Sequence, residues 1–214
     1  MINKHLTSME KEIYLSIKYG DPAKLNDLGG GEQVDLNFKI EIEKDLFYYP
    51  IMLAAAIGEA DCLKIMLKNT QLQIDVVDAK TGTNAFWIAS FYGRGECMGL
   101  LANSGINILN THKETKSNAL HVAIERKHYD VAIMLIQSKF PLENEKLDGL
   151  TPLIISSRDN DAFNVSETLI KKGAYINKVS ETGQSALSQA VFNNNQLLSE
   201  HLVKHGGLMF NEDL

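Results

Sequence analysis

One seven-residue segment recurs five times along the chain at nearly constant spacing. The copies begin at Tyr49, Asn84, Asn118, Thr151 and Ser185, and small residues occupy the same places in each copy. The second residues of the copies fall at positions 50, 85, 119, 152 and 186, so the intervals are 35, 34, 33 and 34 residues. A fixed period in the low thirties is typical of a stacked helical repeat array. Such arrays normally present surfaces that bind other proteins.

Each repeat is expected to fold as two short antiparallel helices followed by an extended connection. The recurring segment forms the first helix, and Pro50 suits its first turn because a backbone N–H would have no helical partner there. Small residues such as Ala54 and Ala89 let neighbouring first helices approach closely. Aliphatic residues at i, i+3 and i+4 spacing, as in residues 63–67, form the core-facing stripe of the second helix.

The turn between the two helices of a unit is expected to favour a left-handed backbone. It falls at Gly58, Gly93, Lys127, Asn160 and Asn194. One extra residue after Asn160 predicts a locally distorted turn. Polar hairpin tips, the fingers between units, are expected at residues 80–82, 147–149 and 181–183.

Composition and charge exclude several classes of protein. A formal net charge of −6 and a pI near 5.5 argue against a nucleic-acid binder, which needs a basic surface to engage phosphates. The longest strongly apolar uncharged stretch, residues 47–58, is too short to span a bilayer. The first residues lack the features of a secretory signal. We therefore expect a cytoplasmic protein that neither binds nucleic acid nor inserts into a membrane.

The two cysteines agree with an intracellular location. Cys62 and Cys97 are one repeat apart and occupy equivalent places in their units. Equivalent atoms of stacked helices lie roughly 10 Å apart, whereas a disulfide needs Cα atoms within about 7 Å. Both are expected to be buried free thiols that fill apolar space.

These patterns resemble the ankyrin repeat family over nearly the whole chain. Residues 148–153 (DGLTPL) and 171–177 (KKGAYIN) lie close to the family pattern, and residues 119–123 keep even its histidine, His121. The resemblance implies an all-α ankyrin repeat solenoid of about six helix-turn-helix units with hairpin fingers. It also implies that His121 is a structural residue that hydrogen-bonds between neighbouring loops.

The expected organisation is a single ankyrin repeat domain over residues 1–214. Its units are approximately residues 8–44 (a degenerate cap), 45–79, 80–113, 114–146, 147–180 and 181–214. In the first unit, residues 13–21 align with residues 51–59, and an insertion of about four residues lies near Gly29–Gly30–Gly31–Glu32. The insertion is expected to be flexible and is no phosphate-binding loop, because no Lys-Ser/Thr follows it.

No catalytic residues, cofactor or metal site are expected. His201 and His205 have an i, i+4 spacing that can bind a metal, but no Glu stands at the zincin position and no third ligand is obvious. A solvated or capping pair near the helix end explains them better. No nucleophile-elbow Gly-x-Ser-x-Gly occurs, so the chain is not expected to be an enzyme.

The resemblance also implies where a partner binds, because the two residues before the turn glycine face the concave side in this family. The candidate partner-binding residues are Tyr19, Ile57, Phe91, Tyr92, Glu125, Arg126, Arg158, Asp159 and Phe192. The first four come from three consecutive units and are expected to form a contiguous aromatic–apolar patch, with charges of both signs beside it. The alternative is that Phe91 and Tyr92 merely pack on their own finger or on neighbouring helices.

Two functions remain open within this class. The chain is either an adaptor or regulatory binder that engages one or more proteins through its concave face and finger tips, or a stoichiometric structural subunit of a large assembly. The last unit lacks a polar capping helix over Leu197, Leu198, Leu202 and Val203. The tail at residues 208–210 either folds back over this end or leaves it to dock on another subunit.

Overall fold

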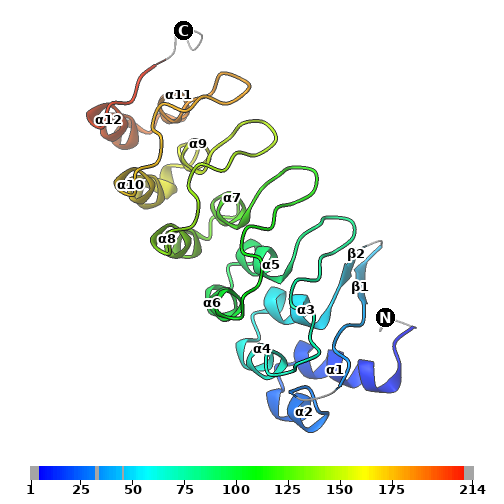
Figure 1. Cartoon of the computed structure of the whole chain (residues 1–214). Helices are drawn as coiled ribbons and strands as arrows, with labels where there is room; N and C mark the ends of the chain where they lie inside the picture. Colours follow the sequence, from blue (N-terminus) through cyan, green and yellow to red (C-terminus); the bar gives the residue numbers. More distant parts are fainter. Residues whose placement is uncertain (1–4, 32–33, 45, 210–214) are drawn as a thin grey trace. The chain divides into compact units, whose positions relative to one another are not determined.

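Helices begin at the recurring segments, as the repeat pattern predicts (Figure 1). The structure is a computed structural model and describes residues 5–31, 34–44 and 46–209. By their internal contacts, residues 1–113 and 114–214 form two units. Apart from one β-hairpin, the regular secondary structure of the described residues is helical, which fits an all-α repeat architecture.

The described part of residues 1–113 folds into helix pairs that stack in two rows. The first helices of the pairs pack side by side, as do the second helices. The first row comprises α1 (Ser8–Lys18), α3 (Pro50–Ile57) and α5 (Ala85–Phe91). The second row comprises α2 (Pro22–Asp27), α4 (Ala60–Met66) and α6 (Gly95–Asn103).

Residues 114–214 repeat this arrangement. The first row comprises α7 (Ala119–Glu125), α9 (Pro152–Ser156) and α11 (Ala186–Phe192). The second row comprises α8 (Tyr129–Gln137), α10 (Phe163–Lys171) and α12 (Gln196–Lys204). Before α10, a 3₁₀ turn spans Asn160–Ala162. This turn stands where the sequence predicted an extra residue and a distorted connection.

The first residue of each recurring segment is the N-cap of a first helix. The side chains of Asn84, Asn118, Thr151 and Ser185 each accept a hydrogen bond from the backbone N–H three residues later. Such a bond satisfies one of the N–H groups that a helix start leaves without a helical partner. Tyr49 makes no such cap, and Pro50 occupies the first turn of α3 instead.

Left-handed turns join the helices of a pair at four of the five predicted places. The prediction is wrong for Asn160, which begins the 3₁₀ turn before α10 and has no positive φ. Gly58, Gly93, Lys127 and Asn194 have φ values of 97°, 68°, 61° and 55°. The small residues of the first helices, including Ala54 and Ala89, are fully buried, which agrees with their role in close helix packing.

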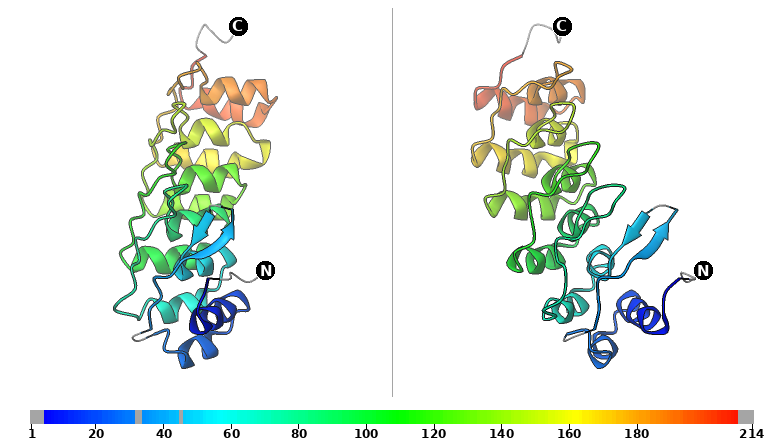
Figure 2. Two further views of the ribbon diagram at one scale, coloured as in Figure 1. Left: turned by 90° about the vertical axis from the view of Figure 1, so that its right-hand side faces the viewer. Right: turned by 45° about the vertical axis from the view of Figure 1, so that its right-hand side comes forward.

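The fingers form hydrogen bonds with one another through their backbones within each unit (Figure 2). Lys113 N donates to Thr81 O at 2.7 Å, Leu147 N to Thr115 O at 2.9 Å, and Glu181 N to Asp148 O at 3.1 Å. One connection carries more regular structure than the sequence indicated. Strands β1 (Ile40–Glu43) and β2 (Leu46–Tyr48) form an antiparallel hairpin before α3, with an irregularity between Glu41 and Glu43.

The glycine insertion after α2 forms backbone contacts with the end of that helix. Gly30 N donates to Leu25 O at 3.0 Å, and a Cβ at Gly30 would lie 2.8 Å from that same oxygen. Asn69 Nδ2 ties the following segment down by donating to Val34 O at 2.9 Å. Gly29–Gly31 therefore close the end of α2, and the flexibility of the insertion stays a prediction. Glu32 lies outside the described residues.

Both cysteines are buried free thiols, as predicted. Burial, followed by nearby carboxylates, raises the pKa of Cys62 to about 11, and burial is also the largest cause that raises the pKa of Cys97 to about 11. Both side chains therefore stay protonated at neutral pH and behave as small apolar groups.

Candidate partner-binding site

Three aromatic residues cluster at the C-terminal end of α5. Trp87 and Phe91 are one helical turn apart, so they share a face, and their rings stack with centroids 5.4 Å apart. Tyr92, the C-cap of α5, meets Phe91 edge to face at 4.9 Å. The imidazole of His112 lies against the other side of Trp87, at 5.8 Å. The cluster extends the aromatic surface well beyond the two residues that the sequence singled out.

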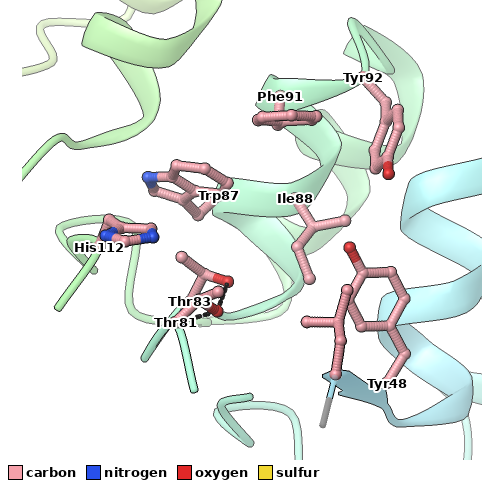
Figure 3. A pocket seen from close by; sticks show the side chains of 9 residues that line it. Tyr48, Thr81, Thr83, Trp87, Ile88, Phe91, Tyr92 and His112 are labelled. Carbon is pink, nitrogen blue, oxygen red and sulfur yellow. Dashed lines mark hydrogen bonds between the residues drawn. The ribbon is translucent and has the colours of Figure 1, made fainter. Parts of the chain in front are cut away.

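Strand β2 and the finger before α5 close this cluster into a pocket of about 200 Å³ (Figure 3). The hairpin brings Tyr48 opposite Tyr92, and Ile88 lies between the two walls. The lining residues come from three segments of residues 1–113 and are mostly apolar. They are Leu46, Tyr48, Thr81, Thr83, Trp87, Ile88, Phe91, Tyr92 and His112. We call this site the aromatic pocket.

A buried carboxylate supports one wall of the aromatic pocket. Asp78 is 1% exposed and accepts hydrogen bonds from Thr81 N (2.7 Å), Thr81 Oγ1 (2.9 Å), Lys80 N (3.1 Å) and Phe47 N (3.2 Å). These four donors are uncharged groups, so they orient the carboxylate without neutralising it. The same bonds hold the finger against the β-hairpin.

Besides burial, the negative charge of the Asp78 carboxylate is one of the causes that raise the pKa of the Tyr48 phenol. Burial is the largest cause that raises the pKa of Tyr48. Tyr92 raises it further, partly through a hydrogen bond between the two side chains, and the carboxylates of Asp78 and Glu43 add to the effect. Tyr48 therefore stays protonated, and the aromatic pocket lies in a negative electrostatic environment.

Only half of the predicted aromatic–apolar patch lines this pocket. Phe91 and Tyr92 do, whereas Tyr19 and Ile57 do not. Tyr19 is 73% exposed at the end of α1, with Lys18 Nζ 5.7 Å from its ring centroid, and Ile57 is half-buried. For Phe91 the two alternatives, packing within the protein and a place in the binding surface, are not exclusive. Its ring packs on Trp87 and also lines the pocket.

Sequence reasoning missed Tyr48, Trp87 and His112. One signal was available for Trp87, because the chain has a single tryptophan and it stands four residues before Phe91 on one helix. Tyr48 had no such signal. It is 44 positions from Tyr92 in the sequence, and only the hairpin brings the two together.

In residues 114–214, most of the predicted charged residues bind other side chains of the same unit. Glu125 pairs with Lys146 at 2.6 Å. Asp159 pairs with Lys127 at 2.6 Å and accepts from the Tyr129 hydroxyl at 2.8 Å. Arg158 donates to the side chain of Gln184, Arg126 is exposed, and Phe192 is 80% exposed.

These contacts change the acidity of Asp159. Burial alone would raise its pKa, but the hydrogen bonds from Lys127 and Tyr129 outweigh burial and hold the pKa below its usual value. The side chain is therefore ionised at neutral pH and serves as an acceptor within its own unit.

His121 is fully buried and is part of the start of α7. Its Nδ1 accepts a hydrogen bond from Asn118 N at 3.2 Å. Burial lowers the pKa of His121 to about 4, and backbone groups of Asn144 and Leu150 oppose that shift only in part. The imidazole is therefore neutral at pH 7. The Nδ1 bond stays within the start of α7, and Nε2 is buried without a hydrogen-bond partner among the described residues. A hydrogen bond from His121 to a neighbouring loop therefore stays an expectation from the family resemblance.

The end of the last helix pair carries a second apolar hollow, of about 490 Å³. Leu198 and Leu202 are fully buried, whereas Leu197 and Val203 are more than half exposed. The lining residues are Leu187, Val191, Ser199, Glu200, Val203, Lys204 and Met209. Met209 brings the described part of the tail to this end, and Phe210 lies outside the described residues.

His201 and His205 contact each other, with ring centroids 4.3 Å apart, and His205 Nδ1 lies 2.8 Å from His201 O. Among the residues that the structure describes, no group of three or more His, Cys, Asp or Glu side chains could hold a metal ion. None of the described helices has the length and apolar character needed to cross a membrane.

Paired rows of short helices, left-handed turns and hydrogen-bonded fingers define a helical repeat protein. The chain belongs to the ankyrin repeat family, because the family profile described as ankyrin repeats (3 copies) matches residues 51–144 and 120–212. Ankyrin repeats are generally protein–protein interaction modules, and the family is non-catalytic.

Two curated proteins are similar to parts of the chain. The putative ankyrin repeat protein FPV031 of Fowlpox virus (strain NVSL) is 34% identical over 111 residues, which is 50% of this chain and 32% of the viral protein. The neurogenic locus notch homolog protein 1 of Xenopus laevis is 31% identical over 127 residues, 59% of this chain and 5% of that protein. The chain therefore spans only a minor part of either relative.

Proposed function

We propose that this chain is a non-catalytic adaptor or regulatory binder of another protein, and that the aromatic pocket and the finger beside it form its main contact surface. The observation that carries the proposal is the aromatic pocket itself. Trp and Tyr are the side chains that most often dominate binding energy at protein interfaces. Here Tyr48, Trp87 and Tyr92 surround one hollow, and Tyr92 is 41% exposed.

The remaining predicted residues are proposed as further contacts, separately in each unit. Tyr19 and Ile57 stand at the ends of the neighbouring first helices α1 and α3, and Tyr19 offers an exposed ring. In residues 114–214, Arg126 and Phe192 are exposed at the ends of α7 and α11 and are proposed as a second contact region. We assign Glu125, Arg158 and Asp159 mainly to holding their own unit together, since each has a partner there.

The proposal includes six ankyrin units in one domain, with the first unit (residues 8–44) as a degenerate cap. Helices α1 and α2 supply that cap, because they continue the two rows that α3, α4, α5 and α6 form. A cytoplasmic location is part of the same proposal and is supported by two buried thiols that remain unpaired.

Affinity capture with matched variants tests the contact surface. The wild-type chain, the Tyr19→Ala/Tyr92→Ala variant and the Tyr175→Ala control are crosslinked to partners in a lysate of the native source and compared by quantitative mass spectrometry. Tyr175 is 68% exposed but belongs to a loop after α10, so it matches the lost aromatic area at another place. A partner that disappears only with the double variant supports the proposal. Equal capture by all three chains contradicts it.

The alternative function is that of a structural subunit in a large assembly. It is favoured by the apolar hollow at the last helix pair and by the exposure of Leu197 and Val203 there. Sedimentation of the purified chain at nanomolar to micromolar concentration separates the two functions. A stable monomer supports the adaptor, whereas obligate self-association supports the subunit.

A further inference from the structure

The chemistry of the aromatic pocket indicates which kind of side chain it takes. Its volume of about 200 Å³ lies below the range of about 300–1,000 Å³ of pockets for drug-sized ligands. The pocket therefore has room for the end of a single side chain. Aromatic rings, among them two phenols and the His112 imidazole, line the pocket together with aliphatic side chains and threonine hydroxyls.

The aromatic rings that line the pocket favour a cationic ligand. Trp87, Phe91 and Tyr92 form a continuous series of contacts, with ring centroids 5.4 and 4.9 Å apart, and Tyr48 faces them across Ile88 (Figure 3). Aromatic faces carry negative charge density and attract a Lys or Arg cation within about 6 Å of the ring centroid. Because Phe91 and His112 lie on either side of Trp87, we assign this contact to the rings of Phe91, Tyr92 and Tyr48. The planar guanidinium of arginine also stacks on such faces.

The hydroxyls of Thr81 and Thr83 favour a ligand that donates hydrogen bonds. The proton of Thr81 Oγ1 goes to Asp78 Oδ1, because a carboxylate can only accept. At the 2.7 Å contact between Thr81 Oγ1 and Thr83 Oγ1, Thr83 must then be the donor. Thr81 Oγ1 also accepts from Thr83 N at 3.4 Å, so both of its lone pairs are used. Neither threonine has a hydroxyl proton left for a ligand, and Thr83 Oγ1 is the one that keeps lone pairs to accept from it.

The surrounding charge also favours a cation. The carboxylate of Asp78 lies directly behind Thr81, and its four hydrogen-bond donors are uncharged. Glu43, exposed on the β-hairpin, adds a second negative charge, and both carboxylates act on the phenol of Tyr48 in the pocket wall. In a partly desolvated pocket such charges are screened less than on an open surface.

We propose that the aromatic pocket binds the guanidinium of one arginine side chain from a basic segment of the partner protein. The aliphatic part of that side chain lies on Ile88 and Leu46, and the guanidinium stacks on the aromatic rings and donates toward Thr83. This inference rests on the proposed protein-binding function and names the partner chemistry at its central contact.

The single tryptophan of the chain makes a direct test possible. Trp87 lines the pocket, so the one indole N–H signal in a ¹⁵N NMR spectrum of the full chain reports on the site. N-acetyl-arginine amide, its uncharged isostere N-acetyl-citrulline amide and N-acetyl-leucine amide are titrated at equal ionic strength. We expect a saturable shift with the arginine derivative and affinity about 3-fold or more higher than for citrulline.

Variants test separately how much the Tyr92 ring and the Glu43 charge contribute to arginine binding. Tyr92→Leu should weaken arginine binding by about 3-fold or more, whereas Tyr92→Phe, which keeps the ring, should retain it. Glu43→Gln should weaken arginine binding but not leucine binding. Asp130→Asn, the same loss of charge on an exposed residue of α8, is the control and should change neither.

Equal affinity for the three amides would overturn the arginine assignment and leave an apolar docking pocket, with the proposed function intact. No shift with any amide would also overturn it. Loss of arginine selectivity in Tyr92→Leu, together with unchanged partner capture by the Tyr19→Ala/Tyr92→Ala variant, would instead keep the arginine site and contradict the proposed function.

Discussion

The same repeat position is used differently in the two units. At the end of α5, in residues 1–113, Phe91 and Tyr92 are rings that surround a hollow together with Tyr48. At the ends of α7 and α9, in residues 114–214, Glu125 and Asp159 form ion pairs within their own unit. An ion pair satisfies both charges and leaves little for a partner, whereas a ring that packs by one face keeps its other face available. The comparison assigns cohesion to Glu125 and Asp159 and agrees with the proposed role of the aromatic pocket in recognition.

The largest expected effect is in the aromatic cluster. Trp87→Ala should lower the free energy of unfolding by about 3–5 kcal/mol, because Trp87 is mostly buried and its loss leaves a cavity between Phe91 and His112. Urea denaturation measures this change. Tyr19→Ala, which removes an exposed ring, should stay within about 0.5 kcal/mol of the wild type. Equal effects of the two changes would mean that Trp87 adds little packing and that the cluster is only a surface feature.

The second effect is a pH dependence that belongs to residues 114–214. The pKa of His121 is about 4 in the folded chain against an ordinary value of 6.5, so below pH 6.5 the unfolded chain binds a proton that the folded chain does not. Stability should therefore fall as the pH decreases from 6.5 toward 4, by on the order of 3 kcal/mol.

Urea denaturation at several pH values measures this loss. His121→Gln should remove most of the slope between pH 6.5 and 4, whereas His5→Gln, at an exposed position, should keep it. A slope that survives in the His121→Gln variant would assign the pH dependence to other groups.

A third, smaller effect is expected at two glycines, Gly173 and Gly99, where an added Cβ would have no heavy atom within 4 Å. Gly173 has a φ of 91°, so Gly173→Ala should destabilise the chain by about 1–2 kcal/mol through backbone strain alone. Gly99 lies within α6, and Gly99→Ala should stabilise it by about 0.5–1 kcal/mol, because alanine loses less conformational entropy in a helix. Thermal melts of both variants give the signs. The same sign for both would contradict the left-handed turn at Gly173.

The smallest effect should come from the ion pairs. A double-mutant cycle of Glu125→Gln and Lys146→Met should give a coupling of about 0.2–1 kcal/mol, as is usual for pairs that water partly screens. Partner capture should be unaffected by either change. If Glu125→Gln abolished capture while the Tyr19→Ala/Tyr92→Ala variant retained it, the roles of the two units would be reversed.

Much of the fold could be predicted from local sequence patterns. The period located the first helices, and the left-handed turns at Gly58, Gly93 and Asn194 followed from residues that tolerate that backbone. The burial of Cys62 and Cys97 followed from their equivalent places in successive repeats. These features depend on nearest neighbours in a repeating structure, so they are encoded locally.

The candidate site was only partly predictable. Phe91 and Tyr92 were found from their repeat position, but Tyr19 does not line the aromatic pocket that they help to form. Tyr48 was missed because it precedes the recurring segment and belongs to an unexpected hairpin. For the charged residues, the repeat position identified Glu125 and Asp159 but could not show that Lys146 and Lys127 pair with them.

The sequence by itself determined the repeat, its helices and turns, and membership of the ankyrin repeat family, because period and backbone preference act over short distances along the chain. Only the tertiary structure decided that Tyr48 and Tyr92 meet across a pocket and that Asp78 lies behind its wall. The physical reason is that a binding pocket depends on side-chain packing between segments far apart in sequence. A repeat pattern specifies that such segments lie near each other, but not which of their side chains leave a hollow.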